Sequence, residues 1–260
     1  MLQDVVLVKL GGSVVTHKER PMTINKKALD KLFRTFSSVR VPIMVVHGGG
    51  SFGHYWSVKY DMHSKPDRYQ SEGIAIVHES MISLNHKLVK SMIRFKLNPY
   101  SVSPFSIVSN NKPLVKKIVE LASMTKDKII PVTYGDIVYR THHKYSILSG
   151  DELMTILSYA IRPKKVIFAV NVDGIYQDPH TLDLIDTVEE ESIIRFSNVK
   201  FDVTGGMKRK VREALKISLG GVDVHFVNGF RPERLLKILD NKKTKGTVIK
   251  GKRSSKRNAR

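Results

Sequence analysis

Hydrophobic and polar positions alternate between two kinds of segment along the chain. Short apolar runs that end in glycine or a polar turn predict buried strands, and longer stretches with an apolar residue every three or four positions predict amphipathic helices. The predicted strands are residues 4–9, 41–46, 104–108, 128–132, 164–170, 222–227 and 247–249. The predicted helices are residues 25–37, 71–96, 114–124, 151–161, 206–219 and 232–239.

Strands that alternate with helices predict an α/β fold with a mostly parallel sheet covered on both faces. Asn25 is the expected N-cap of the first long helix, and a hairpin is expected between Gly135-Asp136 and His142-His143. Such sheets bind ligands beyond the carboxyl ends of their strands. The glycine-rich turns after the first two predicted strands lie at that edge.

Composition narrows the class of protein. The 260 residues correspond to one large domain or two small ones, and 41% hydrophobic with 26% charged residues excludes wholesale disorder. The chain has no cysteine, which excludes a disulfide scaffold, a thiol nucleophile and a Cys-based zinc site, and is compatible with a reducing cytosol. No apolar run approaches the length of a membrane span, and we expect no signal peptide.

The charge of the chain is strongly positive. Lys and Arg number 44 against 24 Asp and Glu, a formal net charge of +20. Residues 242–260 hold nine Lys or Arg and no acid, which leaves an excess of 11 in the rest of the chain. A field of this sign attracts nucleic acid, phosphorylated metabolites or acidic membranes. A solvated basic surface with no partner is the alternative.

The segment 45–54, VVHGGGSFGH, is the strongest chemical signal. Its glycines fit the dinucleotide fingerprint, but no acidic residue ends a following strand about 20 positions on. They also fit the nucleophile elbow of hydrolases, for which Ser51, Asp173 and His225 would supply a triad. Bare amides at the start of a helix bind anions, and a tight turn without a ligand is the alternative.

Three further turns combine glycine with charge. Residues 9–13, KLGGS, place a lysine at the tip of a buried strand, where a phosphate would be its partner unless the side chain simply reaches solvent. Residues 204–210, TGGMKRK, open a helix with a basic turn that a bound anion would stabilise, with an N-cap at Thr204 as the alternative. Ser149-Gly150-Asp151 begins another helix. Asp151 either caps this helix or is a carboxylate that orients lysines around phosphates.

The remaining polar motifs give weaker signals. Asn171 to Tyr176, NVDGIY, follows a buried strand and is either a turn or a nucleotide-binding loop. His78-Glu79 lacks the second histidine of a zinc motif, and His142-His143 is expected to be a loop pair. We therefore predict no metal-ligating residues.

These segments, in this order, resemble the amino acid kinase family. The shared marks are the KxGGS opening, the triple-glycine turn, the DGIY loop and the TGGMxxK helix, and the resemblance runs from about residue 5 to 250. It implies a three-layer α/β/α sandwich forming one domain over residues 1–251. An acceptor lobe would cover about 1–160 and a nucleotide lobe about 161–251. Residues 252–260 are expected to be a disordered basic tail.

Within the family, residues 47–54 and the position of Lys18, nine residues after Lys9, are similar to the isopentenyl phosphate kinase subgroup. The fosfomycin kinases share similar local features and remain an alternative. The resemblance implies ATP-dependent phosphorylation of isopentenyl phosphate by a cytoplasmic homodimer that uses ATP and Mg²⁺. Nucleic-acid binding through the basic tail is a lower alternative.

The resemblance also implies a role for each motif residue. Lys9 and Lys210 would contact the transferring phosphoryl group and the ATP phosphates, Lys18 would stabilise the transition state, and Asp151 would orient the lysines. The residues implied around ATP are Gly11, Gly12, Ser13, Gly50, Asp173, Gly174 and Gly206. Gly49, His54 and Gly150 would hold the acceptor phosphate. The apolar face of Ile74, Val77 and Met81 either lines the isoprenoid pocket or packs in the core.

Overall fold

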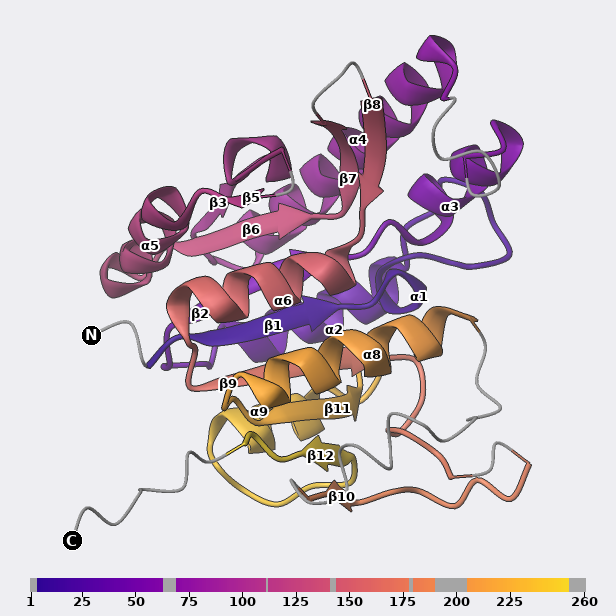
Figure 1. Cartoon of the computed structure of the whole chain (residues 1–260). Helices are drawn as coiled ribbons and strands as arrows, with labels where there is room; N and C mark the ends of the chain where they lie inside the picture. The colour runs from indigo at the N-terminus through magenta and orange to yellow at the C-terminus, as the bar shows by residue number, and fades with distance from the viewer. Residues whose placement is uncertain are drawn as a thin grey trace, which may run out of the picture.

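The computed structural model describes residues 4–62, 69–110, 112–140, 144–177, 180–189 and 205–252. One eight-stranded sheet runs through the molecule in the order β10-β12-β11-β9-β1-β2-β6-β3 (Figure 1). Its strands are β1 (Val6–Leu10), β2 (Ile43–His47), β3 (Pro99–Ser101), β6 (Ile130–Tyr134), β9 (Lys165–Val170), β10 (Thr187–Val188), β11 (Val224–Asn228) and β12 (Thr247–Ile249). Neighbouring strands are parallel except for β11 and β12, so the predicted mostly parallel sheet is confirmed.

Helices cover both faces of this sheet (Figure 1). One layer holds α1 (Gly12–Val15), α2 (Lys26–Phe36), α3 (Gly50–Lys59), α4 (Ser71–Arg94) and α9 (Pro232–Leu239). The other layer holds α5 (Val115–Ser123), α6 (Gly150–Ile161) and α8 (Gly205–Leu219). Alternate residues of β1 explain the two layers, because Val6 and Val8 pack in the core under α2, whereas Leu7 packs in the core under α6. The three-layer α/β/α sandwich is confirmed.

Several local predictions are confirmed in detail. Asn25 caps α2 by accepting a hydrogen bond from the Ala28 amide at 3.1 Å. The predicted hairpin is the antiparallel pair β7 (Asp136–Arg140) and β8 (Lys144–Leu148), although its expected tip, His142-His143, lies outside the described residues. The basic tail beyond Lys252 also lies outside them.

The predicted strand at 104–108 is wrong. Pro104–Ser106 forms a short 3₁₀ helix, with Ser103 accepting from the Phe105 amide, because proline suits the first turn of a helix and cannot donate to a sheet. Only Val108–Ser109 (β4) is extended, and it pairs with β5 (Lys112–Pro113) outside the main sheet. A second 3₁₀ helix, Met124–Asp127, follows α5.

Among the described residues, no helix combines the length and apolar character that crossing a bilayer requires. The sheet order places β1 between two groups of strands, with β2, β6 and β3 on one side and β9, β11, β12 and β10 on the other. Strand order therefore reverses around β1, and the crevice beyond the carboxyl ends of β1, β2 and β9 is the expected ligand site of such a sheet. The division into two lobes near residue 160 stays a prediction.

Candidate active site

Two glycine turns touch each other beyond the carboxyl ends of β1 and β2. A Cβ added to Gly12 would lie 2.4 Å from the Gly50 nitrogen, and one added to Gly48 would lie 2.9 Å from the Gly12 nitrogen. Gly50 also has a φ of +49°, in the left-handed region that glycine adopts at least cost. Glycine is therefore required in both turns by close backbone approach as well as by backbone conformation.

Helix α3 begins at the second of these turns. Gly49 is its N-cap, and the Ser51 amide donates to the Thr16 hydroxyl at 2.9 Å, which ties α3 to the end of α1. The N-terminal amides and dipole of a helix attract anions. His54 is exposed one turn into α3. The start of α3 therefore joins an exposed imidazole to a helix end suited to a phosphate.

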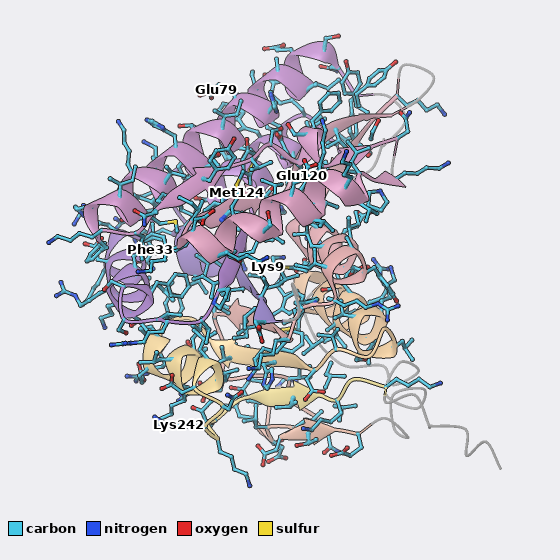
Figure 2. The ribbon with its side chains drawn as sticks, turned by 90° about the vertical axis from the view of Figure 1, so that its left-hand side faces the viewer. Lys9, Phe33, Glu79, Glu120, Met124 and Lys242 are labelled. Atoms are coloured by element: carbon cyan, nitrogen blue, oxygen red, sulfur yellow. The ribbon has the colours of Figure 1, made fainter. Side chains whose placement is uncertain are left out.

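Lys9 forms a buried ion pair with Asp151 across the crevice. Lys9 shares the orientation of Leu7 along β1, toward the layer that contains α6, and only 4% of its side chain is exposed. Figure 2 shows Lys9 near the middle of the molecule. Asp151 lies in the first turn of α6, and the cap of that helix is Ser149, whose hydroxyl accepts from the Glu152 amide at 3.1 Å. Asp151 is therefore a charge partner for Lys9, and the alternative that it caps α6 is wrong.

Helix α8 adds two further cations to this carboxylate. Arg209 Nε donates to Asp151 Oδ2 at 3.2 Å, and Lys210 Nζ lies 3.8 Å from the same oxygen. The predicted pair Lys9 and Lys210 is thus brought together around the predicted Asp151. Arg209 was not among the predicted site residues, although the basic first turn of its helix indicated an anion site.

Burial and charge shift the pKa values of this cluster. Burial is the largest influence on Lys9 and lowers its pKa; Asp151 opposes this shift, the charges of Lys210 and Arg209 add to it, and the net pKa is about 8. Burial alone would raise the pKa of Asp151, but Lys9 and Lys210 hold it below its usual range. With three cations around one carboxylate, the cluster carries surplus positive charge that suits a polyanion.

Gly150 brings the ion pair and the second glycine turn into contact. A Cβ added to Gly150 would lie 3.3 Å from Lys9 Cε and 3.1 Å from the His47 carbonyl oxygen. Gly150 is the first residue of α6, so the N-termini of α3 and α6 open near the same lysine. This arrangement can hold two anionic groups side by side.

His47 directly precedes the glycine turn and anchors it in the core. Its ring is fully buried, stacks on Tyr134 at 5.3 Å between ring centroids, and lies 3.3 Å from Asn85 Oδ1. Burial lowers its pKa to about 4, so the ring is neutral near pH 7. Sequence reasoning gave His47 no role of its own, because Asn85 and Tyr134 are distant in the chain.

Asp173 is held by cations and an amide. Its Oδ1 accepts from Arg234 at 2.6 Å and Asn228 at 3.0 Å, and its Oδ2 pairs with Lys245 at 2.8 Å. Hydrogen bonds from Lys245 and Asn228 hold its pKa well below the usual range. Gly174 is packed so tightly that an added Cβ would lie 2.5 Å from Thr247 Oγ1. Asp173 therefore fixes the loop after β9.

The alternative prediction of a hydrolase triad of Ser51, Asp173 and His225 is wrong. The buried Ser51 hydroxyl has no hydrogen-bond partner within the part of the chain that the structure describes, so no base activates it. Asp173 is engaged with its own three partners. Burial lowers the pKa of His225 to about 4, where it lies beside Lys165 and Asp223.

Three further predicted site residues are Lys18, Gly206 and Ser13. Lys18 is exposed in the loop after α1, and within the described residues no hydrogen bond or ion pair joins it to Lys9 or Asp151. Gly206 is exposed in the first turn of α8, where an added Cβ would lie 3.8 Å from Lys210 Nζ. Ser13 is half-buried inside α1, one residue after Gly12. Their roles stay predictions.

A small apolar cluster lies between α3, α4 and the β7–β8 hairpin. Its buried members are Met62, Val77 and Ile137, and its partly buried members are Trp56, Tyr60, Tyr69, Ile74 and Ile147. Met81 instead belongs to the main core, with its sulfur 3.1 Å from a Cβ added to Gly49. The predicted apolar face of α4 thus divides between this cluster and the core.

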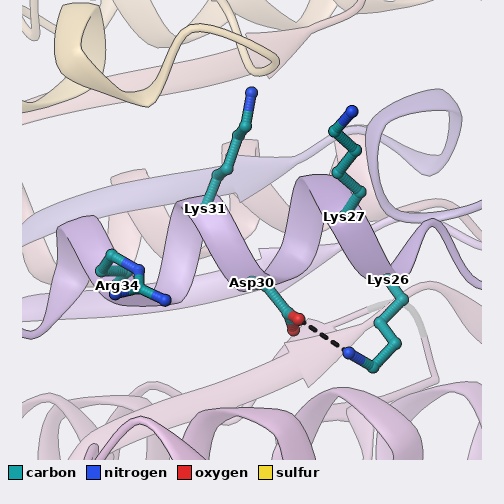
Figure 3. Close-up of a pocket in the computed structure, with 5 residues that line it drawn as sticks. All are labelled: Lys26, Lys27, Asp30, Lys31 and Arg34. Atoms are coloured by element: carbon teal, nitrogen blue, oxygen red, sulfur yellow. Dashed lines mark hydrogen bonds and ion pairs between the residues drawn. The ribbon is translucent and has the colours of Figure 1, made fainter.

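The described residues hold no metal-ligand cluster, and one pocket among them lies on the surface of α2. No group of three or more His, Cys, Asp or Glu that could hold a metal ion is present there. A shallow pocket on α2 is lined by Lys26, Lys27, Asp30, Lys31 and Arg34, with Lys26 paired to Asp30 at 2.9 Å (Figure 3). Because the side chains of α2 alone line this pocket, it is a solvated basic surface.

Comparison with known proteins gives a consistent result. Residues 4–228 match the model of the amino acid kinase family. The chain is 31% identical to isopentenyl phosphate kinase of Thermoplasma acidophilum, covering 94% of this chain and 100% of that protein. It is 30% identical to isopentenyl phosphate kinase of Methanothermobacter thermautotrophicus, covering 95% and 99%.

The fold agrees with these matches. A crystal structure of an isopentenyl phosphate kinase substrate complex superposes with a TM-score of 0.79 at 28% identity, covering 95% of this chain and 100% of that chain. An N-acetylglutamate synthase from Neisseria gonorrhoeae, at 13% identity and a TM-score of 0.71, shares the fold alone. The chain belongs to the amino acid kinase family.

Proposed function

We propose that this protein transfers the γ-phosphoryl group of ATP to isopentenyl phosphate, giving isopentenyl diphosphate and ADP. The observation that carries the proposal is the contact at Gly150, where the Lys9–Asp151 pair meets the turn that opens α3. Phosphoryl transfer needs two phosphates held in line and their charge neutralised, with little covalent work by the protein. Full-length similarity to isopentenyl phosphate kinases supports this acceptor over others.

On the donor side, the turn after β1 and the start of α8 are proposed to hold ATP. The amides of Gly11, Gly12 and Ser13, joined by Gly50 and Gly206, would cradle its phosphates, while Lys9 and Lys210 neutralise the group in transfer. Asp151 would orient Lys9 through their direct ion pair, while Lys210 lies 3.8 Å from the same carboxylate. Asp173 and Gly174 would lie beside the nucleotide, in the loop after β9 that Asp173 holds in place.

On the acceptor side, the start of α3 is proposed to hold the phosphate of isopentenyl phosphate. Gly49 and Gly150 would donate backbone amides, and His54 a ring N–H. A phosphate monoester is already ionised at neutral pH, so it attacks without a general base. Lys18, in the loop that leads away from α1, would stabilise the charge that develops in transfer.

The apolar cluster beside α3 is proposed to receive the isoprenoid chain. It lies where α4 and the hairpin β7–β8 meet the end of α3, and it offers Val77 and Ile74 from the predicted apolar face. A small hydrocarbon binds by burying apolar area in such a cluster. A substitution of Val77 by Phe would therefore raise KM for isopentenyl phosphate more than KM for ATP.

The proposal also includes Mg²⁺, a homodimeric assembly and a cytoplasmic location, each implied by the family resemblance. Mg²⁺ in kinase sites is held by nucleotide phosphates with one or two carboxylates, so the proposed metal would arrive with ATP. A bound Mg²⁺ would neutralise part of the ATP charge.

The test is a coupled ADP-release assay with Mg-ATP and five acceptors: isopentenyl phosphate, fosfomycin, carbamate, UMP and acetylglutamate. We expect turnover of isopentenyl phosphate with kcat/KM at least tenfold above the others. Turnover of fosfomycin without turnover of isopentenyl phosphate would overturn the proposal and favour the fosfomycin kinases. Salt-sensitive RNA binding that disappears on deleting residues 252–260 would indicate a separate role for the basic tail.

A further inference from the structure

We infer that Arg209 is a positioning residue for phosphoryl transfer, which occupies Asp151 Oδ2 so that Lys210 stays available to the ATP phosphates. The inference rests on the proposed function and extends it to a residue outside the family motif. In that motif, TGGMxxK, Arg209 stands at a variable position. Its contact with Asp151 nevertheless joins α8 to the ion pair at the centre of the site.

The two oxygens of Asp151 are shared unequally among three cations. Oδ1 accepts from Lys9, while Oδ2 accepts from Arg209 Nε at 3.2 Å. Lys210 Nζ remains 3.8 Å from Oδ2 and donates instead to the Gly206 carbonyl oxygen at 3.1 Å. An ammonium at 3.8 Å makes no good hydrogen bond to the carboxylate. Arg209 therefore holds the position on Asp151 that Lys210 would otherwise take.

Exposure places the three cations at graded depth. Side-chain exposure is 4% for Lys9, 19% for Lys210 and 47% for Arg209. Lys9, the most buried cation, forms an ion pair with Asp151. Arg209, the most exposed cation, contacts the same carboxylate from the solvent side. Lys210 lies between them, next to Gly206 in the turn proposed to hold ATP phosphates. A rigid guanidinium suits the outer position, because it fixes a carboxylate at lower entropic cost than a flexible ammonium.

The charge of Arg209 also acts on Lys9. Together with burial and with Lys210, it lowers the pKa of Lys9 toward 8. Without Arg209, the protonated form of Lys9 would persist to higher pH. The positional effect and the charge effect are separable, because lysine at position 209 restores the charge without restoring the planar Nε–H donor.

The experiment compares Arg209→Ala and Arg209→Lys with Arg212→Ala as the matched control. Arg212 lies on the same helix and is 68% exposed, and it pairs with Glu213 instead of Asp151. For Arg209→Ala we expect kcat/KM for ATP to fall about tenfold, KM for isopentenyl phosphate to stay within twofold, and the alkaline pKa of kcat/KM for ATP to rise. Arg209→Lys should return the alkaline pKa to the wild-type value and recover less than half of the lost kcat/KM.

Three outcomes would overturn the inference: Arg209→Ala matching Arg212→Ala in every parameter, an alkaline pKa that does not move, or complete recovery in Arg209→Lys. Calorimetric titration with ATP alone, repeated between pH 7 and 9.5, measures the same Lys210 and Lys9 effects without an acceptor. If the wild-type protein did not use isopentenyl phosphate, the proposed function would fail, while this titration would still decide the role of Arg209.

Discussion

Lys9, at the carboxyl end of the central strand, is paired with Asp151, 142 residues later in the first turn of α6. Both side chains are almost fully buried, at 4% and 2% exposed. A buried ion pair adds little to stability compared with apolar residues of the same volume, but removing one partner is costly. The pair therefore ties together two parts of the chain that the proposed phosphoryl transfer would use.

The first prediction is that Asp151→Asn unfolds more easily than Lys9→Met/Asp151→Leu. The single variant leaves the Lys9 charge buried without its partner, which costs on the order of 3 kcal/mol of the free energy of unfolding. The double variant removes both charges and should recover most of that loss. Urea unfolding of both variants measures the difference, and neither should phosphorylate any acceptor. Equal stability of the two would contradict a buried, charged Lys9.

The second prediction concerns alkaline pH. Because the pKa of Lys9 is lowered to about 8, kcat/KM for ATP should fall above pH 8 as the ammonium loses its proton. When ATP is bound, its phosphates favour the protonated form of Lys9. The alkaline decrease in kcat should therefore occur at higher pH than the decrease in kcat/KM.

Unfolding does not explain this loss. The folded pKa of Lys9 lies below the unfolded value of 10.5, so the folded state binds fewer protons between pH 8 and 10.5 and gains stability from Lys9 as pH rises. Thermal melting over the same pH range checks this. Lys9→Arg is the control, because arginine does not titrate there, and any residual activity of that variant should show no limb near pH 8.

The third prediction is that Lys18→Ala lowers kcat by about 10²–10³, as the loss of one preorganised transition-state donor usually does. Lys18 is exposed, so the melting temperature should stay unchanged. Lys27→Ala, at an exposed position on α2, serves as the matched control and should retain wild-type kcat. A kcat for Lys18→Ala within threefold of wild type would make Lys18 an ordinary surface lysine.

The fourth prediction is that His54 binds the acceptor phosphate and does not act as a base. His54→Ala should lose about 10–100-fold in kcat/KM for isopentenyl phosphate, the range for one charge-assisted hydrogen bond. His54→Gln should keep measurable activity, because an amide also donates. The exposed position of His54 predicts unchanged melting. A lower melting temperature with kcat/KM intact would instead assign His54 to packing of α3.

The fifth prediction is a loss of stability in acid through His47. Its folded pKa of about 4 lies below the unfolded value of 6.5, so the unfolded state binds more protons and stability falls as pH drops from 6.5 to 4. The full effect is about 3 kcal/mol. In His47→Asn, the free energy of unfolding should fall by that much less than in wild type over this pH range. His225→Asn should remove a second, independent part of the acid-induced loss, because burial also lowers the pKa of His225. Identical slopes for wild type and His47→Asn would contradict the prediction.

The sequence predicted most of the main-chain elements because their periodicity is regular. The long stripe of α4 and the apolar runs of β1 and β9 leave no alternative to a helix and buried strands. It failed for α1 and α3, which begin in glycine and lack a regular apolar period. It also missed β3 and β10, of three and two residues, because edge strands this short carry too few positions to show alternation.

Site residues that belong to local motifs were predictable, whereas those defined by tertiary contact were not. Asp151 and Lys210 stand in recognisable turns, so their meeting at Lys9 was expected. Arg209 and Asn85 carry no signal of their own, since one stands at a variable motif position and the other is one polar residue inside a long helix. Their partners are fixed only when the layers pack.

The contact between Gly12 and Gly50 has a consequence for how this enzyme can change its substrate. The proposed donor and acceptor turns touch through backbone atoms, so the separation of the two phosphates is set by main-chain geometry. Larger side chains there would push the turns apart and break the in-line arrangement. If the apolar cluster between α4 and the β7–β8 hairpin receives the far end of the substrate, as proposed, a new acceptor would be accommodated there.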